Sequence, residues 1–353
     1  MKKEHSHKKY HRVRRRIKYW FKHHHRFAVA SAAVFVIIAT GILFIAKMII
    51  STQNDQHITA GESRDMGWGY REISYQGKTY RYNSLLTTFL VSGIDSEGEI
   101  ETYEQYSYAP RADSIYLVAA NKKTGQLTII PINRDTMTDV RRYTISGYDR
   151  GTYTTHIGYA YTYGDGGEAS CENLCEAVSR MFGEIPINEY VILNRSSMPY
   201  INQFVGGVRV TVPNDDLADL HPEWKRGETI TLKDEEVEDY LRYRDIEEDF
   251  SNEGRIERQK SYLIPFLKKA YDLAETDSRG TWKKMEDMQK YMLTSITENK
   301  YISMVELFSY MNTDDIVFLE LSGEDRLGTK NDEFYVDEEE LQKVIIDTFY
   351  EEA

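Results

Sequence analysis

The sequence predicts a layered α/β/α domain with a central mixed sheet, preceded by one transmembrane helix. Three observations support this fold class. Strand-like and helix-like stretches alternate from residue 73 to the C-terminus, which is typical of a sheet covered by helices on both faces. Twenty consecutive uncharged residues, 27–46, precede this region. The chain has two cysteines, so no disulfide framework holds the domain together.

The N-terminal region has the pattern of a membrane anchor. Residues 1–26 carry eleven Lys and Arg against one Glu, and the apolar run that follows is long enough to cross a hydrocarbon core of about 30 Å. A basic flank on the N-terminal side alone places residues 1–26 in the cytoplasm. A cleaved signal peptide is the alternative, but this apolar run is longer than the apolar region of a usual signal peptide, and no clear cleavage site follows it.

We therefore expect a single-pass type II protein of the cell membrane. Its parts are a basic tail (1–26), a signal anchor (27–50), an extracytoplasmic linker (51–72) and an external domain (73–353). The basic tail adjoins the span, which favours contact with anionic lipid. Twenty-six residues leave no room for a folded domain that reads nucleic acid, so none is expected as a partner.

The first half of the external domain reads as strands. Residues 73–82 alternate around Gln76-Gly77 as a hairpin. The run TTFLVSGID (87–95) has the pattern of a buried strand, and two further strands, 114–120 and 126–132, flank a turn at 121–125.

The second half mixes helices and strands. Residues 143–167 are predicted to be a tyrosine-dense loop whose rings could stack on sugars. Helices are expected at 168–182, 233–243, from 255 through 274, 282–298, 303–311 and 337–351, and strands at 190–193, 205–212 and 316–321, the last strand of the chain. On the helix at 168–182, Cys171 and Cys175 lie at i and i+4, where a disulfide and two free thiols both remain open.

Arginines gather in an otherwise acidic domain, as Arg242-Tyr243-Arg244 and Arg255-Ile256-Glu257-Arg258-Gln259. A guanidinium is planar, always charged and able to donate two hydrogen bonds to phosphate oxygens. On a helix, Arg255, Arg258 and Gln259 share one face. The cluster therefore suggests an anion site, whereas the simpler alternative is a solvated face paired with residues 247–249 and 257.

Three short motifs lie at predicted strand ends, where open α/β sheets place their sites. They are Gly93-Ile94-Asp95, Arg111-Ala112-Asp113-Ser114 and Asn133-Arg134-Asp135-Thr136. Strand pairing could bring Asp95 and Asp113 together, and two carboxylates suit a divalent cation that also holds phosphate oxygens. An aspartate that caps a turn, or a local pair of Arg134 with Asp135, would explain each motif alone.

The motifs in this order resemble the LytR-CpsA-Psr family of cell-wall phosphotransferases, from about residue 85 to the C-terminus. The resemblance rests on GID, RADS, IPINRDT, VGGVRVTV, YLRYR and GRIERQ. It implies a protein that takes a glycopolymer from a polyprenyl pyrophosphate carrier and transfers it, with its phosphate, to a sugar hydroxyl of peptidoglycan. Teichoic acid and capsular polysaccharide would present the same pyrophosphate, so the polymer stays open.

The resemblance also implies residue roles. Asp95 and Asp113 match the aspartates that hold Mg²⁺ on the pyrophosphate. The arginines that bind its oxygens are matched by Arg134, Arg242, Arg244 and Arg255, with Arg258 and Gln259 completing the last motif. The implied catalytic set is thus Asp95, Asp113, Arg134, Arg242, Arg244 and Arg255. The implied substrate-binding set is Arg134, Arg242, Arg244, Arg255, Arg258 and Gln259. Charge neutralisation and positioning are what phosphoryl transfer mainly needs.

The chain departs from the family pattern at several places. Asn133 stands before RDT where the family usually has proline, and residues 154–161, which include His156, stand where a lysine-containing motif is usual. Asp249 and Glu253 are both candidates for a displaced acid of the last motif. Two rival functions follow, namely a non-catalytic binder of lipid-linked glycan that regulates wall assembly, and a pyrophosphatase with water as acceptor.

A polyprenyl tail needs an apolar groove, which the family resemblance places between sheet and helices. The apolar faces of residues 201–212 and 262–271 could line it. Periodicity alone predicts the same residues as ordinary core.

Overall fold

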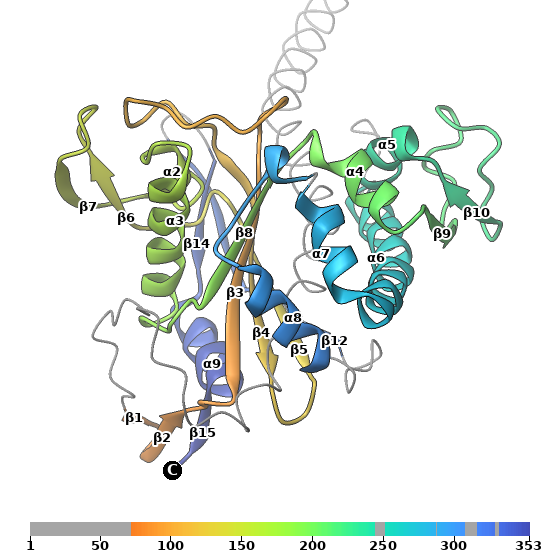
Figure 1. Ribbon diagram of the computed structural model, residues 1–353. Coiled ribbons are helices and arrows are strands. Elements are labelled where there is room, and N and C mark those ends of the chain that lie inside the picture. The colour runs from red at the N-terminus through yellow and green to blue at the C-terminus, as the bar shows by residue number, and fades with distance from the viewer. Residues whose placement is uncertain (1–71, 244–250, 287, 308–315, 329–331) are drawn as a thin grey trace, which may run out of the picture.

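The computed structural model describes residues 72–353 except 244–250, 287, 308–315 and 329–331 (Figure 1). The predicted tail and anchor, and the linker up to residue 71, lie outside these residues. Among the helices that the structure describes, none combines the length and the apolar character needed to span a membrane.

The centre of the fold is a six-stranded mixed sheet in the order β11-β8-β3-β4-β5-β12. Strand β3 pairs antiparallel with β4 and parallel with β8, and β5 pairs antiparallel with β4 and parallel with β12. All nine residues of β3 are buried, Thr87, Thr88 and Ser92 included, as expected for an uncharged strand covered on both faces. The strands are β3 (Leu86–Ile94), β4 (Ala112–Asn121), β5 (Leu127–Ile132), β8 (Glu189–Asn194), β11 (Met292–Thr294) and β12 (Ile316–Phe318).

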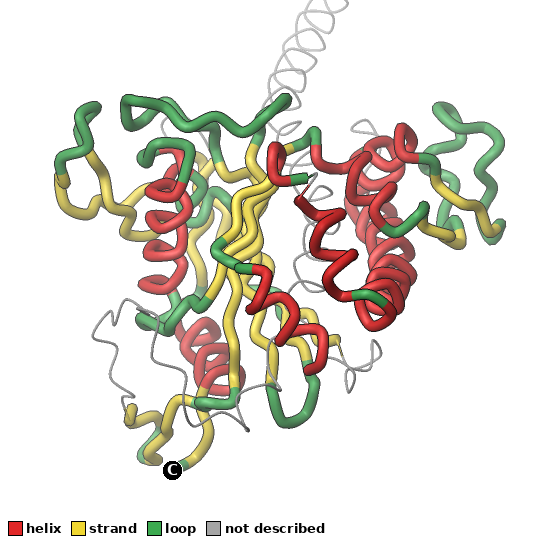
Figure 2. The backbone as a smooth tube through the Cα atoms, in the orientation of Figure 1, coloured by secondary structure: helices red, strands yellow, loops and turns green. Residues whose placement is uncertain are grey.

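Helices cover both faces of this sheet, which confirms the predicted layers (Figures 1 and 2). On one face lie α2 (Tyr159–Thr162), α3 (Glu168–Met181) and α9 (Glu338–Phe349); on the other lie α4 (Ser197–Phe204), α5 (Val237–Arg242), α6 (Ser251–Thr276), α7 (Ser278–Glu286) and α8 (Glu298–Leu307). Because side chains alternate along a strand, Leu90 and Leu117 enter the core beneath α3, whereas Val91 and Val118 enter the core beneath α6.

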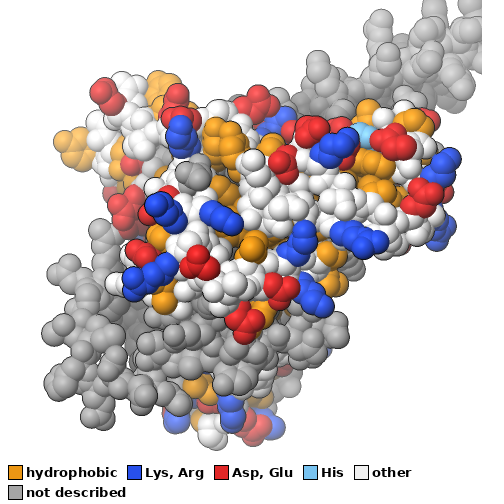
Figure 3. All heavy atoms as spheres, turned by 45° about the vertical axis from the view of Figure 1, so that its right-hand side comes forward, with side chains coloured by type: hydrophobic (Ala, Val, Ile, Leu, Met, Phe, Trp, Pro, Cys, Tyr) orange, Lys and Arg blue, Asp and Glu red, His pale blue; other side chains and the backbone are white. Residues whose placement is uncertain are grey.

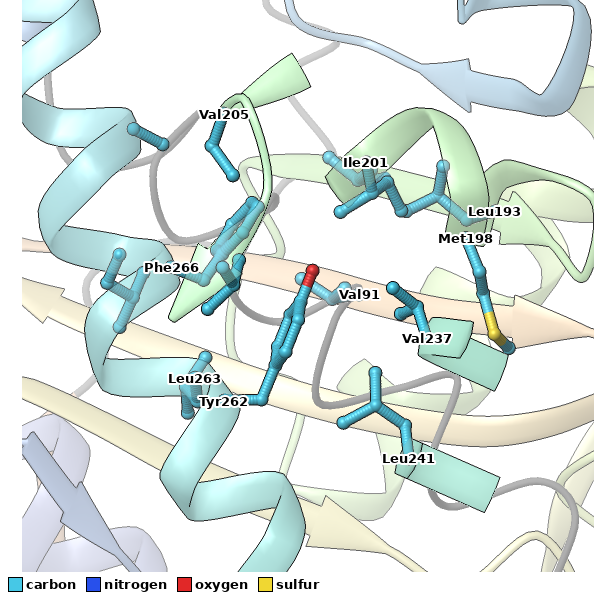
Figure 4. Packing of buried hydrophobic residues seen from close by; sticks show 14 of the residues in the cluster. Val91, Leu193, Met198, Ile201, Val205, Val237, Leu241, Tyr262, Leu263 and Phe266 are labelled. Atoms are coloured by element: carbon cyan, nitrogen blue, oxygen red, sulfur yellow. The ribbon is translucent and has the colours of Figure 1, made fainter. Parts of the chain in front are cut away.

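The core between the sheet and α6 contains the residues that could have lined a lipid groove (Figure 4). Tyr262, Leu263 and Phe266 of α6 pack in one cluster with Ile201 and Val205. Each of these five side chains is at most 5% exposed. In this structure they are core residues, as periodicity alone predicted.

Four smaller sheets surround the central one. They are β1 (Glu72–Tyr75), β2 (Lys78–Tyr82) and β15 (Tyr350–Glu352); β6 (Met137–Tyr143) with β7 (Asp149–His156); β9 (Val208–Thr211) with β10 (Thr229–Leu232); and β13 (Gly323–Leu327) with β14 (Asp332–Val336). The hairpin predicted at 73–82 is confirmed.

Three predicted elements are wrong in part. The expected loop 143–167 contains β7 and α2. Residues 149–154 of β7 are all exposed, so the strand lacks the apolar alternation that reveals a half-buried strand. The helix expected at 282–298 ends as α7 at Glu286, and β11 follows because it pairs with β8. Residues 316–321 do not form the last strand, since β13, β14 and β15 come later.

Short connecting helices complete the side that carries the arginines. The helix predicted at 233–243 is a 3-10 turn, Asp234–Glu236, that continues directly into α5. The helix predicted from residue 255 begins four residues earlier, as α6, and contains Pro265. Helix α6 packs against α5, so Arg242 at the end of α5 is held between the sheet edge and α6.

Candidate functional site

The strand register brings four chain segments to one edge of the central sheet. Ile94 at the end of β3 pairs with Ala112 at the start of β4 and with Asn194 at the end of β8. Ile115 of β4 pairs with Ile132 at the end of β5. The residues just beyond these strands therefore meet at this edge, which is the upper one in Figure 1.

Asp95 and Asp113 both lie at this edge, as predicted. The backbone N–H of Asp95 donates to the Arg111 carbonyl at 3.1 Å, which fixes the two strand ends to each other. The Asp113 side chain is 10% exposed and that of Asp95 is 48% exposed. Burial raises the pKa of Asp113, the Arg134 guanidinium opposes this rise, and the negative charge of Asp95 adds to it. The two carboxylates therefore repel each other across one site.

Arg134 contacts Asp135, the local partner that the sequence suggested, and also Asp113, which was not predicted as its partner. Its Nη1 donates to Asp113 Oδ1 at 2.5 Å, and its Nε lies 3.6 Å from Asp135 Oδ2. The side chain is 6% exposed, so its charge is largely withdrawn from water. The local pair with Asp135 and the contact with the candidate metal ligand thus coexist.

Arg242, at the C-terminal end of α5, faces the same carboxylates. Its side chain is 8% exposed and forms an ion pair with Glu238, one helical turn earlier. Burial lowers the pKa of Arg242, as does the positive charge of Arg195, whereas Glu238, Asp95 and Asp113 raise it. This set of neighbours places Arg242 at the sheet edge, as the sequence predicted.

Arg258 and Gln259 lie behind Arg242. The Arg258 guanidinium is fully buried and donates to the carbonyls of Tyr240 and Tyr243 and to Asp216. Gln259 Nε2 donates to the carbonyl of Leu241 at 3.1 Å. Both side chains therefore hold the end of α5 and position Arg242, and these contacts do not favour the predicted direct contact with substrate.

The remaining predicted residues fall outside the description. Arg244 and Asp249 lie in the segment 244–250, and the side chains of Arg255 and Glu253 at the start of α6 are not described. Their predicted roles stay predictions.

A charged cluster lies beside Arg134, and the sequence did not predict a role for its members Arg111 and His156. Arg111 forms an ion pair with Asp135, donates to the Arg134 carbonyl at 3.2 Å, and lies over the Tyr159 ring. His156 Nδ1 lies 3.4 Å from Asp135 Oδ1, and burial together with the Arg111 charge lowers the pKa of His156. Arg111 stands in the quoted RADS motif, so the motif itself was the available signal.

Arg195 is the second residue that the sequence reading missed. It follows β8 directly, and its Nη1 lies 3.9 Å from Asp95 Oδ1 and 2.9 Å from Glu97 Oε1. Its Nη2 lies 3.1 Å from Glu238 Oε1. Asn194-Arg195 ends a predicted strand as the other motifs do, so the rule of strand ends could have found it.

Asp95 and Asp113 suit a cation whose remaining coordination positions are filled by a phosphorylated ligand and water. In the described part of the chain, no group of three or more His, Cys, Asp or Glu residues could hold a metal by itself. Mg²⁺ commonly takes one or two carboxylates together with waters and phosphate oxygens. Burial is the main cause of the raised pKa of Asp113 and the charge of Asp95 adds to it; a cation held by both carboxylates would relieve this repulsion.

Of the two alternatives left open for Cys171 and Cys175, the structure shows two free thiols. On the face of the molecule in Figure 3, basic and acidic side chains are interspersed.

The fold and the sheet-edge cluster define a class: an α/β domain whose strand ends present paired carboxylates and arginines, a donor set for phosphorylated ligands. The model of the LytR_cpsA_psr family matches residues 52–348, and the chain belongs to this family. This confirms the resemblance read from the motifs.

Curated relatives in this family carry transferase names. The chain is 29% identical over 258 residues to the polyisoprenyl-teichoic acid–peptidoglycan teichoic acid transferase TagV of Bacillus subtilis, covering 69% of this chain and 61% of TagV. It is 25% identical over 232 residues to the transferase TagU of Bacillus cereus, covering 65% of this chain and 67% of TagU. The crystal structure of B. subtilis TagV has a TM-score of 0.54 at 24% identity, over 75% of this chain and 96% of that one. This likeness supports the mixed α/β fold.

Proposed function

We propose that the protein transfers a glycopolymer, with its phosphate, from a polyprenyl pyrophosphate carrier to a sugar hydroxyl of peptidoglycan. The transferase names of the relatives support the general reaction. The proposal places the domain outside the cell membrane, on a single anchor at 27–50 with the N-terminus in the cytoplasm. This location suits the two substrates, since one is held in the membrane and the other lies in the wall.

One observation carries the proposal: Asp95, Asp113, Arg134 and Arg242 converge on one sheet edge, although they come from β3, β4, the end of β5 and α5. A pyrophosphate carries several negative oxygens close together; the two arginines, together with a cation held by the two aspartates, would supply the matching positive charge. A site of this kind acts through positioning and electrostatic stabilisation, with no covalent nucleophile needed on the protein.

In this proposal Asp95 and Asp113 hold Mg²⁺, which supplies charge neutralisation at the phosphate oxygens. Arg134 and Arg242 bind oxygens of the same pyrophosphate. Arg258 and Gln259 act behind them, because they hold the carbonyls at the end of α5 and so set the direction of Arg242.

The test uses the full chain in detergent, a synthetic polyprenyl pyrophosphate-linked glycan as donor and peptidoglycan as acceptor. The readouts are released polyprenyl phosphate and glycan joined to peptidoglycan. We expect Asp113→Asn to lower transfer about 100-fold or more, the scale at which loss of one group stabilising transition-state charge acts. Asp325→Asn is the matched control, since Asp325 is exposed on β13, and it should transfer normally.

Two outcomes would reject the proposal. Donor that remains intact in the presence of wild-type protein and Mg²⁺ would identify a binder. Glycan phosphate released into solution, with nothing joined to peptidoglycan, would identify a pyrophosphatase that uses water as acceptor.

A further inference from the structure

Arg195 stands in the candidate site without a role in the proposed function. Its backbone N–H donates to the Ser96 carbonyl at 3.1 Å, so the chain holds it beside the end of β3. Its side chain is 32% exposed and reaches three carboxylates, those of Asp95, Glu97 and Glu238. The backbone of Arg195 is therefore fixed, while its partly exposed guanidinium can still bind a ligand.

Glu238 joins Arg195 to Arg242. One carboxylate oxygen, Oε1, lies 3.1 Å from Arg195 Nη2 and also pairs with Arg242 Nη1. Two guanidinium groups that share one anionic oxygen resemble the way arginines bind a phosphate oxygen. Glu238 is 44% exposed, whereas Arg242 is 8% exposed. The carboxylate can therefore turn toward solvent while Arg242 stays in place.

Arg195 also has an unused donor. Its Nε is buried and has no hydrogen-bond partner among the residues that the structure describes. A buried donor without a partner is costly and uncommon in folded proteins. An incoming anion that bound the edge of this guanidinium would supply the missing acceptor.

We propose that Arg195 and Arg242 form a second anion-binding pair of the site, on the Asp95 side, and that Glu238 occupies this pair until a pyrophosphate displaces it. The proposal rests on the proposed function, because it assigns the pair to phosphate oxygens of the same donor. Arg134 serves the Asp113 side of the site. Glu238 then acts against binding: it keeps the two guanidinium groups together and competes with the ligand for them.

An alternative explanation is an exposed ion-pair network that only joins β3, β8 and α5. Such pairs contribute little to stability, and this explanation gives Glu238 a supporting role. The two explanations predict different effects on ligand affinity when the charge of Glu238 is removed. If Glu238 only supports the structure, removal of its charge leaves ligand affinity unchanged or weakens it; if Glu238 competes with the ligand, removal of its charge strengthens binding.

The experiment measures binding of inorganic pyrophosphate with Mg²⁺ to the full chain in detergent by titration calorimetry. We expect Arg195→Ala to raise the Kd roughly 10- to 100-fold, the effect of losing hydrogen bonds to a charged group. The Kd of Arg195→Lys should lie between those of wild type and Arg195→Ala, since lysine keeps the positive charge but cannot donate two parallel hydrogen bonds to one anion. Glu238→Gln should lower the Kd severalfold.

The matched control is Arg81→Ala, which breaks an exposed ion pair with Glu72 at the opposite end of the molecule (Figure 1). It should bind pyrophosphate as wild type does. Wild-type affinity in Arg195→Ala, or weaker binding in Glu238→Gln, would overturn the inference. Because Arg195→Lys and Glu238→Gln are conservative, they test it even if Arg195→Ala does not fold.

The failure of this inference is distinguishable from failure of the proposed function. Donor transfer by wild type, with unchanged pyrophosphate affinity in the Arg195 variants, would leave the proposed function standing and remove this pair. Absence of both pyrophosphate binding and transfer in wild type would remove both proposals.

Discussion

Replacing Arg258 with methionine tests whether this arginine serves the fold or the ligand. The side chain is 0% exposed, and its guanidinium donates to the Tyr240 carbonyl at 3.0 Å, to Asp216 at 2.5 Å and to the Tyr243 carbonyl. Methionine keeps roughly the aliphatic part of the side chain and has no donors. The variant leaves two carbonyls at the end of α5, the Asp216 carboxylate and the Asn214 amide oxygen without this partner.

The magnitude follows from these contacts. Removing one partner of a buried ion pair costs about 3–5 kcal/mol, because an uncompensated charge remains. Asp216 is 26% exposed and regains some hydration, so the lower end of this range applies. A loss of about 3 kcal/mol is a large share of a typical stability of about 5–15 kcal/mol.

Urea unfolding of the full chain in detergent, followed by circular dichroism, measures this loss. Arg209→Met is the matched control, since Arg209 is exposed on the neighbouring β9, and it should unfold near the wild-type midpoint. In a double-mutant cycle with Asp216→Asn, we expect a coupling energy of about 1–3 kcal/mol. Wild-type stability of Arg258→Met combined with lost pyrophosphate binding would refute the reasoning, because the guanidinium would then serve the ligand directly.

Two further predictions concern stability. Gly158→Ala should destabilise the fold by about 1–3 kcal/mol and reduce transfer, because an added Cβ would lie 2.6 Å from the Ala112 carbonyl and 3.0 Å from the Arg134 carbonyl; an alanine variant with the wild-type urea midpoint would contradict this. Burial tends to raise the pKa of Glu176, but Arg141 and Arg180 outweigh it and hold that pKa below its ordinary value. Its stabilisation is therefore present above the unfolded pKa and lost as pH falls through the folded pKa. Glu176→Gln should cost about 1 kcal/mol at pH 7, and this cost should shrink as the pH falls through the folded pKa, measured from urea midpoints; a gap that stays the same at every acidic pH where the fold persists would show that charge is not the cause.

Most residues of the candidate site could be predicted because the ends of buried strands can be recognised in the sequence. A buried strand such as 86–94 contains no charged residue, and the charged residue that follows it is Asp95. Pairing of neighbouring strands then brings Asp95 and Asp113 together without any knowledge of the loops. Arg195 also follows a strand directly, so the same pattern applies to it.

Other features depend on tertiary contacts that no local pattern records. The hairpin β6–β7 is polar along most of β7, and β11 is three residues long and exists through its pairing with β8. Arg258 and Arg242 look alike in sequence, as arginines in neighbouring helices. Their roles separate only in the structure, because Arg258 points at the carbonyls of α5 while Arg242 neighbours Asp95 and Asp113.

The buried ion pairs at the sheet edge are better explained by ligand binding than by stability. Replacing such a pair with apolar residues of similar volume is often neutral or stabilising by about 1–4 kcal/mol. The side chains of Arg134 and Asp113 are nevertheless only 6% and 10% exposed; Arg134 lies just after β5 and Asp113 at the start of β4, two strands whose interiors are mostly apolar and buried. An arginine kept for a ligand needs a partner while the ligand is absent, since an unpaired buried charge is far more costly than a paired one.

Internal carboxylates meet that need here, with Asp113 beside Arg134 and Glu238 beside Arg242. The same carboxylates then compete with any anion for the arginines. A cation on Asp95 and Asp113 would weaken the hold of Asp113 on Arg134 and release this arginine for phosphate. If both bind as proposed, cation and pyrophosphate would favour each other's binding, and this coupling would be reciprocal. The acidic residues of the site would then make the arginines selective for an anion that arrives with its own divalent cation.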